Sequence, residues 1–216
     1  MRVVVIGATG FTGSAITQEL LARNHEVVGV ARSTDSLPGH RGLTAEAGSV
    51  HDLNFVQRVA TGADAVVIAI QSRATETSPA LSEAIVGIAQ TVAKTGARLG
   101  VVGGAGSLFV AEGGPRLFDT PEFPAAFVEG SRGAYAVLQA LLASDNSTGD
   151  WFYLSPAAGY GKHNSGERLG HYRTGGDILV KDAEGKSDIS QADYAIAFVD
   201  ELETPVHHRV RFTAAY

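Results

Sequence analysis

The first thirteen residues contain the feature that most restricts the fold of this chain. Residues 3 to 6 form an uninterrupted β-branched run, which is typical of a strand buried on both faces of a parallel sheet. The turn Gly7-Ala8-Thr9-Gly10-Phe11-Thr12-Gly13 follows at once, and apolar residues then recur at helical spacing over residues 11 to 23. A strand, a glycine-rich turn and a helix in this order predict the start of a βαβ unit and hence a parallel sheet.

The same alternation continues to the end of the chain. Further strands are expected at residues 26–31, 43–47, 65–70, 98–102, 151–154, 178–180 and 210–213. Further helices are expected at 53–61 with Asp52 as cap, after a Ser78-Pro79 start, at 131–143, and after a Ser190 cap. The pattern predicts one doubly wound α/β (Rossmann) domain over residues 1–216, with helices on both faces of the sheet and a small C-terminal extension on the substrate side.

Two stretches interrupt the alternation. Residues 103–130 and 157–176 are irregular and carry no clear period. Long irregular segments in a compact domain often cover a ligand site, and solvated insertions are the alternative. We expect both stretches to shape a substrate pocket.

Composition excludes several classes of protein. The 216 residues contain no cysteine, so disulfides, thiolate metal sites and cysteine nucleophiles are absent. The formal net charge is −6 and no Lys/Arg cluster occurs, which argues against nucleic acid as a partner. No apolar run approaches the roughly 20 residues of a membrane span, and no histidines lie at metal-ligand spacing. We therefore expect a cytoplasmic protein without a metal; assembly as a homodimer stays open.

The glycine turn has the spacing of a dinucleotide-binding loop. Gly7 allows a tight exit from the strand, Gly10 allows backbone to approach a pyrophosphate, and Gly13 allows the helix to pack closely on the sheet. The helix start offers unpaired N–H groups to the phosphates. We expect a cofactor to contact Gly7, Thr9, Gly10, Phe11, Thr12 and Gly13; a glycine-rich turn without a ligand is the alternative.

The end of the second strand indicates which dinucleotide is bound. NAD-binding proteins usually place an acid there, about 20 residues beyond the loop, for the ribose 2′-hydroxyl. This chain has Arg32-Ser33 instead. A guanidinium can hold a 2′-phosphate and the Ser33 hydroxyl can add a donor, so NADP(H) is predicted over NAD(H). An ordinary surface arginine is the alternative.

These motifs resemble the atypical short-chain dehydrogenase/reductases, and within them the NADH-flavin reductase-like, NAD(P)H-binding proteins. Biliverdin reductase B and NmrA-like proteins are similar at a greater distance. The resemblance continues through residues 101–108, 119–124, 154–156, 172–177 and 189–195, and so covers nearly the whole chain. It implies that Ala69, Ile70, Gln71, Gly103, Gly104 and Pro156, at the carboxyl ends of strands, line the nicotinamide-ribose side.

The chain also departs from the short-chain dehydrogenase pattern. No tyrosine is followed by lysine four residues on; Tyr135 has Gln139 there, which supplies no charge to lower a tyrosine pKa. The family's Gly-Asp-Val, with its Asp near the adenine, is replaced by Gly48-Ser49-Val50. Ser107 and Tyr135 are the candidate catalytic residues; a turn cap and a core tyrosine are the respective alternatives.

An acceptor that needs little help from a protein acid fits the missing Tyr-Lys pair. An oxidised flavin delocalises the charge of an incoming hydride, so the protein supplies mainly orientation and exclusion of water. The leading hypothesis is therefore an NADPH-dependent oxidoreductase acting on a flavin, a quinone or a related planar small molecule. The alternative is an NmrA-like sensor that binds NADP(H) without turnover; an isomerase is less favoured, because family epimerases generally use the Tyr-Lys pair.

Overall fold

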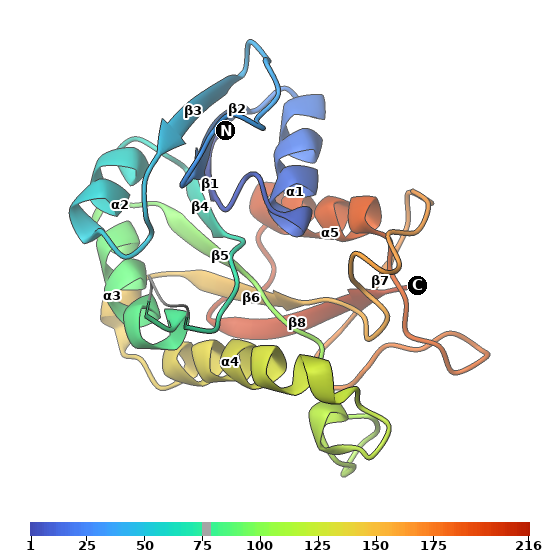
Figure 1. The fold of residues 1–216 in the computed structure, drawn as a ribbon. Coiled ribbons are helices and arrows are strands. Elements are labelled where there is room, and N and C mark those ends of the chain that lie inside the picture. Colours follow the sequence, from blue (N-terminus) through green and yellow to red (C-terminus); the bar gives the residue numbers. More distant parts are fainter. Residues whose placement is uncertain (75–78) are drawn as a thin grey trace.

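A computed structural model describes residues 1–74 and 79–216. Its strands are β1 (Arg2–Ile6), β2 (Glu26–Ala31), β3 (Leu43–Ala47), β4 (Ala65–Ile68), β5 (Arg98–Val102), β6 (Trp151–Ser155), β7 (Arg173–Gly175) and β8 (Val210–Ala215). Its helices are α1 (Phe11–Ala22), α2 (Leu53–Ala60), α3 (Leu81–Lys94), α4 (Ala125–Leu142) and α5 (Gln191–Glu203), with short 3₁₀ turns at Leu117–Asp119 and Asn146–Thr148. Figure 1 shows these elements around one twisted sheet.

The sheet confirms the predicted doubly wound α/β fold. Its strand order is β3-β2-β1-β4-β5-β6-β8-β7, and every pair is parallel except β7–β8. The chain builds outward from β1 in one direction, then returns to β4 and builds in the other. In such sheets, ligands bind outside the carboxyl ends of the strands where the order reverses, which here is between β1 and β4.

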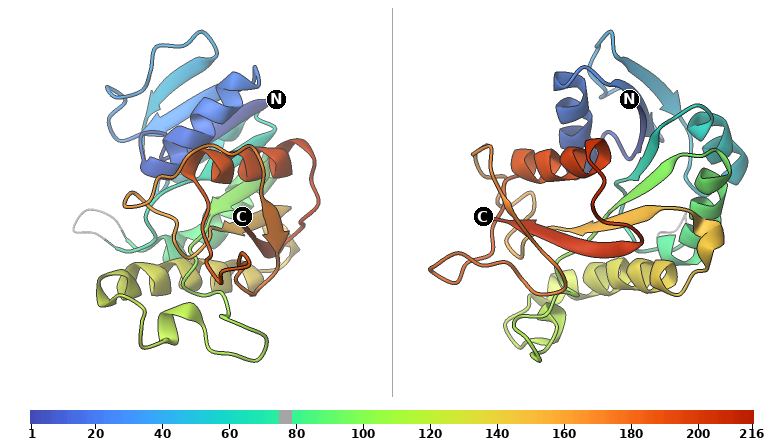
Figure 2. Two further views of the ribbon diagram at one scale, coloured as in Figure 1. Left: turned by 90° about the vertical axis from the view of Figure 1, so that its right-hand side faces the viewer. Right: turned by 180° about the vertical axis from the view of Figure 1, so that it is seen from behind.

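Two helical layers cover the sheet. Helices α1 and α5 pack on one face, and α2, α3 and α4 on the other (Figures 1 and 2). Strand β4 shows why its sequence is continuously apolar: Val66 and Ile68 contribute to one core, whereas Ala65 and Val67 contribute to the other. A strand buried on both faces has no exposed side on which polar residues would alternate.

Helix α4 begins earlier than the sequence pattern predicts. It starts at Ala125 rather than at residue 131, so the second half of the first irregular stretch is partly helical. Pro124 is the N-cap residue, and the added turns carry exposed Ala125, Ala126 and Phe127. An exposed helical turn buries too little apolar surface to produce a period in the sequence.

The short strand of the C-terminal extension was predicted at the wrong residues. Strand β7 is Arg173–Gly175, which pairs antiparallel with β8, while Ile178 forms only an isolated bridge to Phe109. The apolar residues 178–180 favoured a strand by composition, but pairing to the free edge of β8 decides which segment becomes one.

The predicted helix caps have mixed outcomes. The Asp52 carboxylate accepts hydrogen bonds from the backbone of Asn54 and Phe55, and the Ser190 hydroxyl accepts one from the backbone of Asp193, so both caps are confirmed. Ser78 lies outside the described residues. Pro79 is not in the first turn of α3, because Ala80 is the N-cap and the helix begins at Leu81. Strand β4 ends at Ile68, two residues before the predicted end.

Within residues 1–74 and 79–216, the structure contains no helix with the length and apolar character that crossing a membrane requires.

Asp193 in the first turn of α5 anchors the second irregular stretch. Its fully buried carboxylate accepts hydrogen bonds from the backbone N–H groups of Leu169 (2.8 Å) and Gly170 (2.9 Å). It also accepts from the hydroxyls of Ser190 (2.8 Å) and Tyr216 (2.5 Å). Burial alone would raise the pKa of this carboxyl, but these hydrogen bonds outweigh burial and lower the pKa below its usual range.

Replacing Asp193 with Asn is expected to destabilise the fold in a pH-dependent way. At pH 7 the loss is about 3 kcal/mol, because hydrogen bonds to a buried charge are replaced by weaker ones and one donor loses its acceptor. A carboxyl with a depressed pKa stabilises the fold above its unfolded pKa of about 3.9, and this contribution is lost as pH falls towards the folded pKa. Urea unfolding of both proteins from pH 7 to pH 3 should show the difference narrowing only below about pH 4; a constant difference would contradict a charged Asp193.

Candidate functional site

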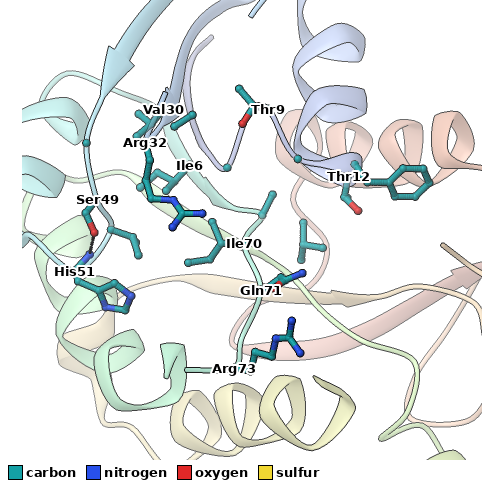
Figure 3. A pocket seen from close by; sticks show the side chains of 18 of the residues that line it. Ile6, Thr9, Thr12, Val30, Arg32, Ser49, His51, Ile70, Gln71 and Arg73 are labelled. Atoms are coloured by element: carbon teal, nitrogen blue, oxygen red, sulfur yellow. Dashed lines mark hydrogen bonds between the residues drawn. The ribbon is translucent and has the colours of Figure 1, made fainter. Parts of the chain in front are cut away.

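A groove of about 450 Å³ lies where the strand order reverses. It follows the carboxyl ends of β3, β2, β1, β4 and β5 and crosses the start of α1, as Figure 3 shows for most of its side chains. Its lining residues are Ile6, Gly7, Thr9, Gly10, Phe11, Thr12, Val30, Ala31, Arg32, Gly48, Ser49, Val50, His51, Ala69, Ile70, Gln71, Arg73, Pro79, Val102 and Lys162.

The glycine turn is held close to β4 by two residues that cannot carry a side chain. Gly7 has φ +93°, and a Cβ there would lie 2.3 Å from the carbonyl oxygen of Ala69. A Cβ on Gly13 would lie 2.1 Å from the carbonyl oxygen of Gly7. Gly13 therefore serves the packing of α1 onto the turn and does not line the groove. Both roles agree with those expected from the spacing.

Gly10 differs from the other two glycines. It has φ −75° and ψ 167°, which any residue adopts, and the nearest atom to an added Cβ is the Gly7 carbonyl oxygen at 3.2 Å. As N-cap it offers no side chain to accept from the first N–H groups of α1, and the first turn contains no acidic residue. These N–H groups, with the Thr9 and Thr12 side chains, are a donor set suited to a pyrophosphate.

Arg32 and Ser33 separate in the structure. Arg32 is exposed and lines the groove at the end of β2. Ser33 lies outside the lining, and its hydroxyl donates a hydrogen bond to the carboxylate of Asp35 at 2.9 Å. Arg32 therefore lies in the groove and Ser33 does not, and the contacts of both with a 2′-phosphate stay predictions.

The end of β3 contributes more than its sequence indicates. Gly48, Ser49 and Val50 line the groove beside Arg32, although the aspartate of the family pattern is missing. His51 lies next to them, and its backbone N–H donates to the Ser49 hydroxyl at 3.3 Å. The buried Nδ1 of His51 has no hydrogen-bond partner among the described residues.

The residues expected on the nicotinamide side divide into two groups. Ala69, Ile70 and Gln71 line the groove after β4. Gly103, Gly104 and Pro156 are not among the lining residues: Gly103 packs so closely on Tyr153 that an added Cβ would meet its ring at 2.2 Å, and Pro156 is buried. From β5 it is Val102 that reaches the groove.

The two candidate catalytic residues are held by arginines outside the groove lining. Ser107 is buried, and its hydroxyl accepts a hydrogen bond from Arg211 at 2.8 Å. Tyr135 packs beneath the guanidinium of Arg116, which lies 4.4 Å from its ring centre. Their participation in a reaction stays a prediction.

Two cations in the groove carried little or no signal in the sequence. Arg73 follows β4 by five residues in a stretch without a motif, and Lys162 lies in the second irregular stretch, which was expected as a whole to shape a substrate pocket. Both come to the groove only through the arrangement of the strands. Across the described residues, no three His, Asp or Glu side chains gather as metal ligands would.

Comparison with known proteins agrees with this geometry. The chain matches the model of a family described as NAD(P)H-binding over residues 7–205. It is 37% identical to YwnB, an uncharacterised protein of Bacillus subtilis, over 99% of this chain and 97% of the relative.

Two solved structures are also similar over the full length of this chain. One is a protein of Bacteroides thetaiotaomicron named as a candidate epimerase, with 39% identity, a TM-score of 0.86 and 96% of that chain covered. The other is a Streptococcus pneumoniae protein named as a candidate NADH-flavin reductase, with 30% identity, a TM-score of 0.80 and 99% of that chain covered. The groove, its glycine turn and a family match over nearly all residues lead to one conclusion: this chain belongs to the NAD(P)H-binding family of Rossmann-fold proteins.

Proposed function

We propose that this protein is an NADPH-dependent reductase of a flavin, a quinone or a similar planar acceptor. The observation that carries the proposal is the charge of the groove. Arg32, Arg73 and Lys162 line it, and none of its described lining residues is an acid, in a chain of net charge −6. A local excess of cations in an acidic protein suits a strongly anionic ligand.

The position of Arg32 supports NADPH over NADH. It occupies the end of β2, where an acid would bind the ribose 2′-hydroxyl of NADH and would repel a 2′-phosphate. An arginine there has the opposite effect, because its planar guanidinium can donate two hydrogen bonds to one phosphate. Arg32 forms no ion pair with any described residue, so its charge is available to a ligand.

Neither Tyr135 nor Ser107 lines the groove, and this supports a planar acceptor. A carbonyl substrate needs a proton donor poised at its oxygen, whereas a flavin or quinone spreads the added charge over its rings. A nicotinamide cofactor bound in the groove would supply the hydride. The chain's own contribution would then be to orient the two rings and to exclude water from them.

The positions of Tyr135 and Ser107 also support a second candidate function. Tyr135 and Ser107 both contact arginines and neither lines the groove. These two residues therefore do not form an acid–base pair that faces the cofactor site. This favours, as the alternative, a sensor that binds NADP(H) and changes its partner without turnover.

Arg32→Gln tests the cofactor preference. We expect Kd for NADPH to rise about 10- to 100-fold, the value of one or two charge-assisted hydrogen bonds, and Kd for NADH to change less than about threefold. Fluorescence titration of both cofactors on both proteins measures this. Equal affinity of the unsubstituted protein for NADPH and NADH would refute the preference.

Gly10→Ala and Gly7→Ala form a matched pair that tests the phosphate site. Alanine at Gly10 should destabilise the fold by no more than about 1 kcal/mol, since its backbone angles are ordinary and the Gly7 carbonyl oxygen, 3.2 Å from the added Cβ, needs only a small shift, but it should raise Kd for NADPH at least about tenfold. Alanine at Gly7 should destabilise the fold by about 2–4 kcal/mol, because of its positive φ and the contact with Ala69. Urea unfolding and titration separate the two effects; a Gly10→Ala protein that binds NADPH normally would contradict the site.

Turnover separates the reductase from the sensor. NADPH oxidation, followed at 340 nm with FMN, riboflavin and menadione as acceptors, should be faster with the protein than without it, and Gly10→Ala should reduce the rate at low NADPH. Tight NADPH binding with no oxidation by any of the three acceptors would favour the sensor instead.

A further inference from the structure

The turn at residues 159–164 contacts the glycine turn (Gly7–Gly13) directly. The hydroxyl of Tyr160 lies 2.8 Å from Oγ1 of Thr12, and its ring lies 5.5 Å from that of Phe11. Burial raises the pKa of Tyr160, so this hydroxyl stays protonated and can donate to Thr12 or accept from it. Gln191 of α5 also donates to the carbonyl of Phe11. Segments from the C-terminal part of the chain thus pack against the start of α1.

The turn is held equally well on its other side. The N–H of Gly159 donates to the carbonyl of Ser187 at 2.8 Å, and the Asn164 side chain donates to Asp188 at 3.2 Å. The backbone reverses between them, with the Asn164 N–H bonded to the Gly161 carbonyl at 2.9 Å. These contacts fix the position of the turn without using the side chain at its tip.

Lys162 is the residue at that tip. It is exposed, it lines the groove together with the Thr9–Thr12 segment, and it forms no ion pair with any described residue. The other two cations, Arg32 and Arg73, belong to segments that follow β2 and β4. Of these three cations, only Lys162 lies two residues from Tyr160, whose side chain contacts the glycine turn at Thr12.

We propose that Lys162 binds the pyrophosphate of the cofactor from the side opposite the N-terminus of α1. An ammonium group is a compact point charge with three donors, which suits a pyrophosphate whose two charges are only partly neutralised by backbone N–H groups. The dinucleotide then lies between the start of α1 and the turn at residues 159–164. The hydrogen bond between Tyr160 and Thr12 joins these two segments. This inference rests on the dinucleotide site of the proposed function, but not on its preference for NADPH or on turnover.

Three ligands distinguish Lys162 from Arg32. NADPH contains both the pyrophosphate and the 2′-phosphate, NADH only the pyrophosphate, and adenosine 2′-monophosphate only the 2′-phosphate. Lys162→Met should raise Kd for NADPH and for NADH by a similar factor of about ten, and leave Kd for adenosine 2′-monophosphate unchanged. Arg32→Gln should weaken NADPH and adenosine 2′-monophosphate and spare NADH.

Controls separate a charge effect from a folding effect. Lys162→Arg keeps the charge and should retain most of the affinity, and Lys186→Met removes an exposed lysine outside the groove and should change none of the three Kd values. The melting temperature of Lys162→Met should match that of the parent protein, since no described hydrogen bond uses this side chain. Added salt should weaken NADH binding less in Lys162→Met than in the parent protein.

Two results would overturn the proposal. One is an unchanged Kd for both dinucleotides in Lys162→Met, and the other is a loss of adenosine 2′-monophosphate affinity as large as the loss for NADPH. If the parent protein binds NADPH and NADH equally, the NADPH preference fails while the Lys162 comparison is still decided by NADH. An absence of turnover likewise leaves these binding measurements intact.

Discussion

The groove depends on the close contact between the glycine turn and the end of β4. Without side chains at Gly7 and Gly13, the first turn of α1 rests on the carboxyl ends of β1 and β4, where the strand order reverses. The positive end of the helix and the ends of five strands therefore face one space. A Cβ at either glycine would push the helix away from the sheet and separate these groups, so the fold and the site share one constraint.

Ion pairs elsewhere in the molecule explain how an acidic chain keeps a cationic groove. Glu19 is buried on α1 between Arg23 and Arg168; burial alone would raise its pKa, but the two arginines outweigh this and lower it. Arg98 pairs in the same way with the buried Glu201 on α5. The ion pair between Glu19 and Arg168 also joins the second irregular stretch, which contains Lys162, to α1. Carboxylates thus stabilise the layer behind the site, while the cations of the groove are left for a ligand.

Local signals in the sequence were sufficient for β1, for the glycine turn and for two helix starts. The run before Gly7, the spacing of the three glycines and the caps at Asp52 and Ser190 each act within a few residues, and the structure agrees with them. The sequence could not locate β7, because Arg173–Gly175 is extended only through its pairing with β8, some forty residues later. The start of α4 was missed for a related reason, since its first turns are exposed and leave no apolar period.

The same distinction applies inside the site. Thr9, Gly10 and Arg32 belong to one βαβ unit and could be assigned from their spacing. Arg73 and Lys162 reach the groove from segments that the sheet brings together, and no local pattern marks them. Sequence reasoning therefore identifies the lining residues that directly follow a strand or belong to the glycine turn, and misses those contributed by longer loops.

Ser107 illustrates what the acceptor side still requires. Its hydroxyl accepts from Arg211, whose guanidinium also pairs with Asp177 on the neighbouring segment. A hydroxyl that accepts a hydrogen bond still has its own proton to donate. Ser107 is buried and is not among the residues that line the groove, so donation to an acceptor bound there would require the loop between β5 and α4 to move. The contacts of Arg211 with Ser107 and Asp177 hold the Ser107 side chain in place, so a reductase with this structure would depend on the orientation of the two rings more than on a proton from Ser107.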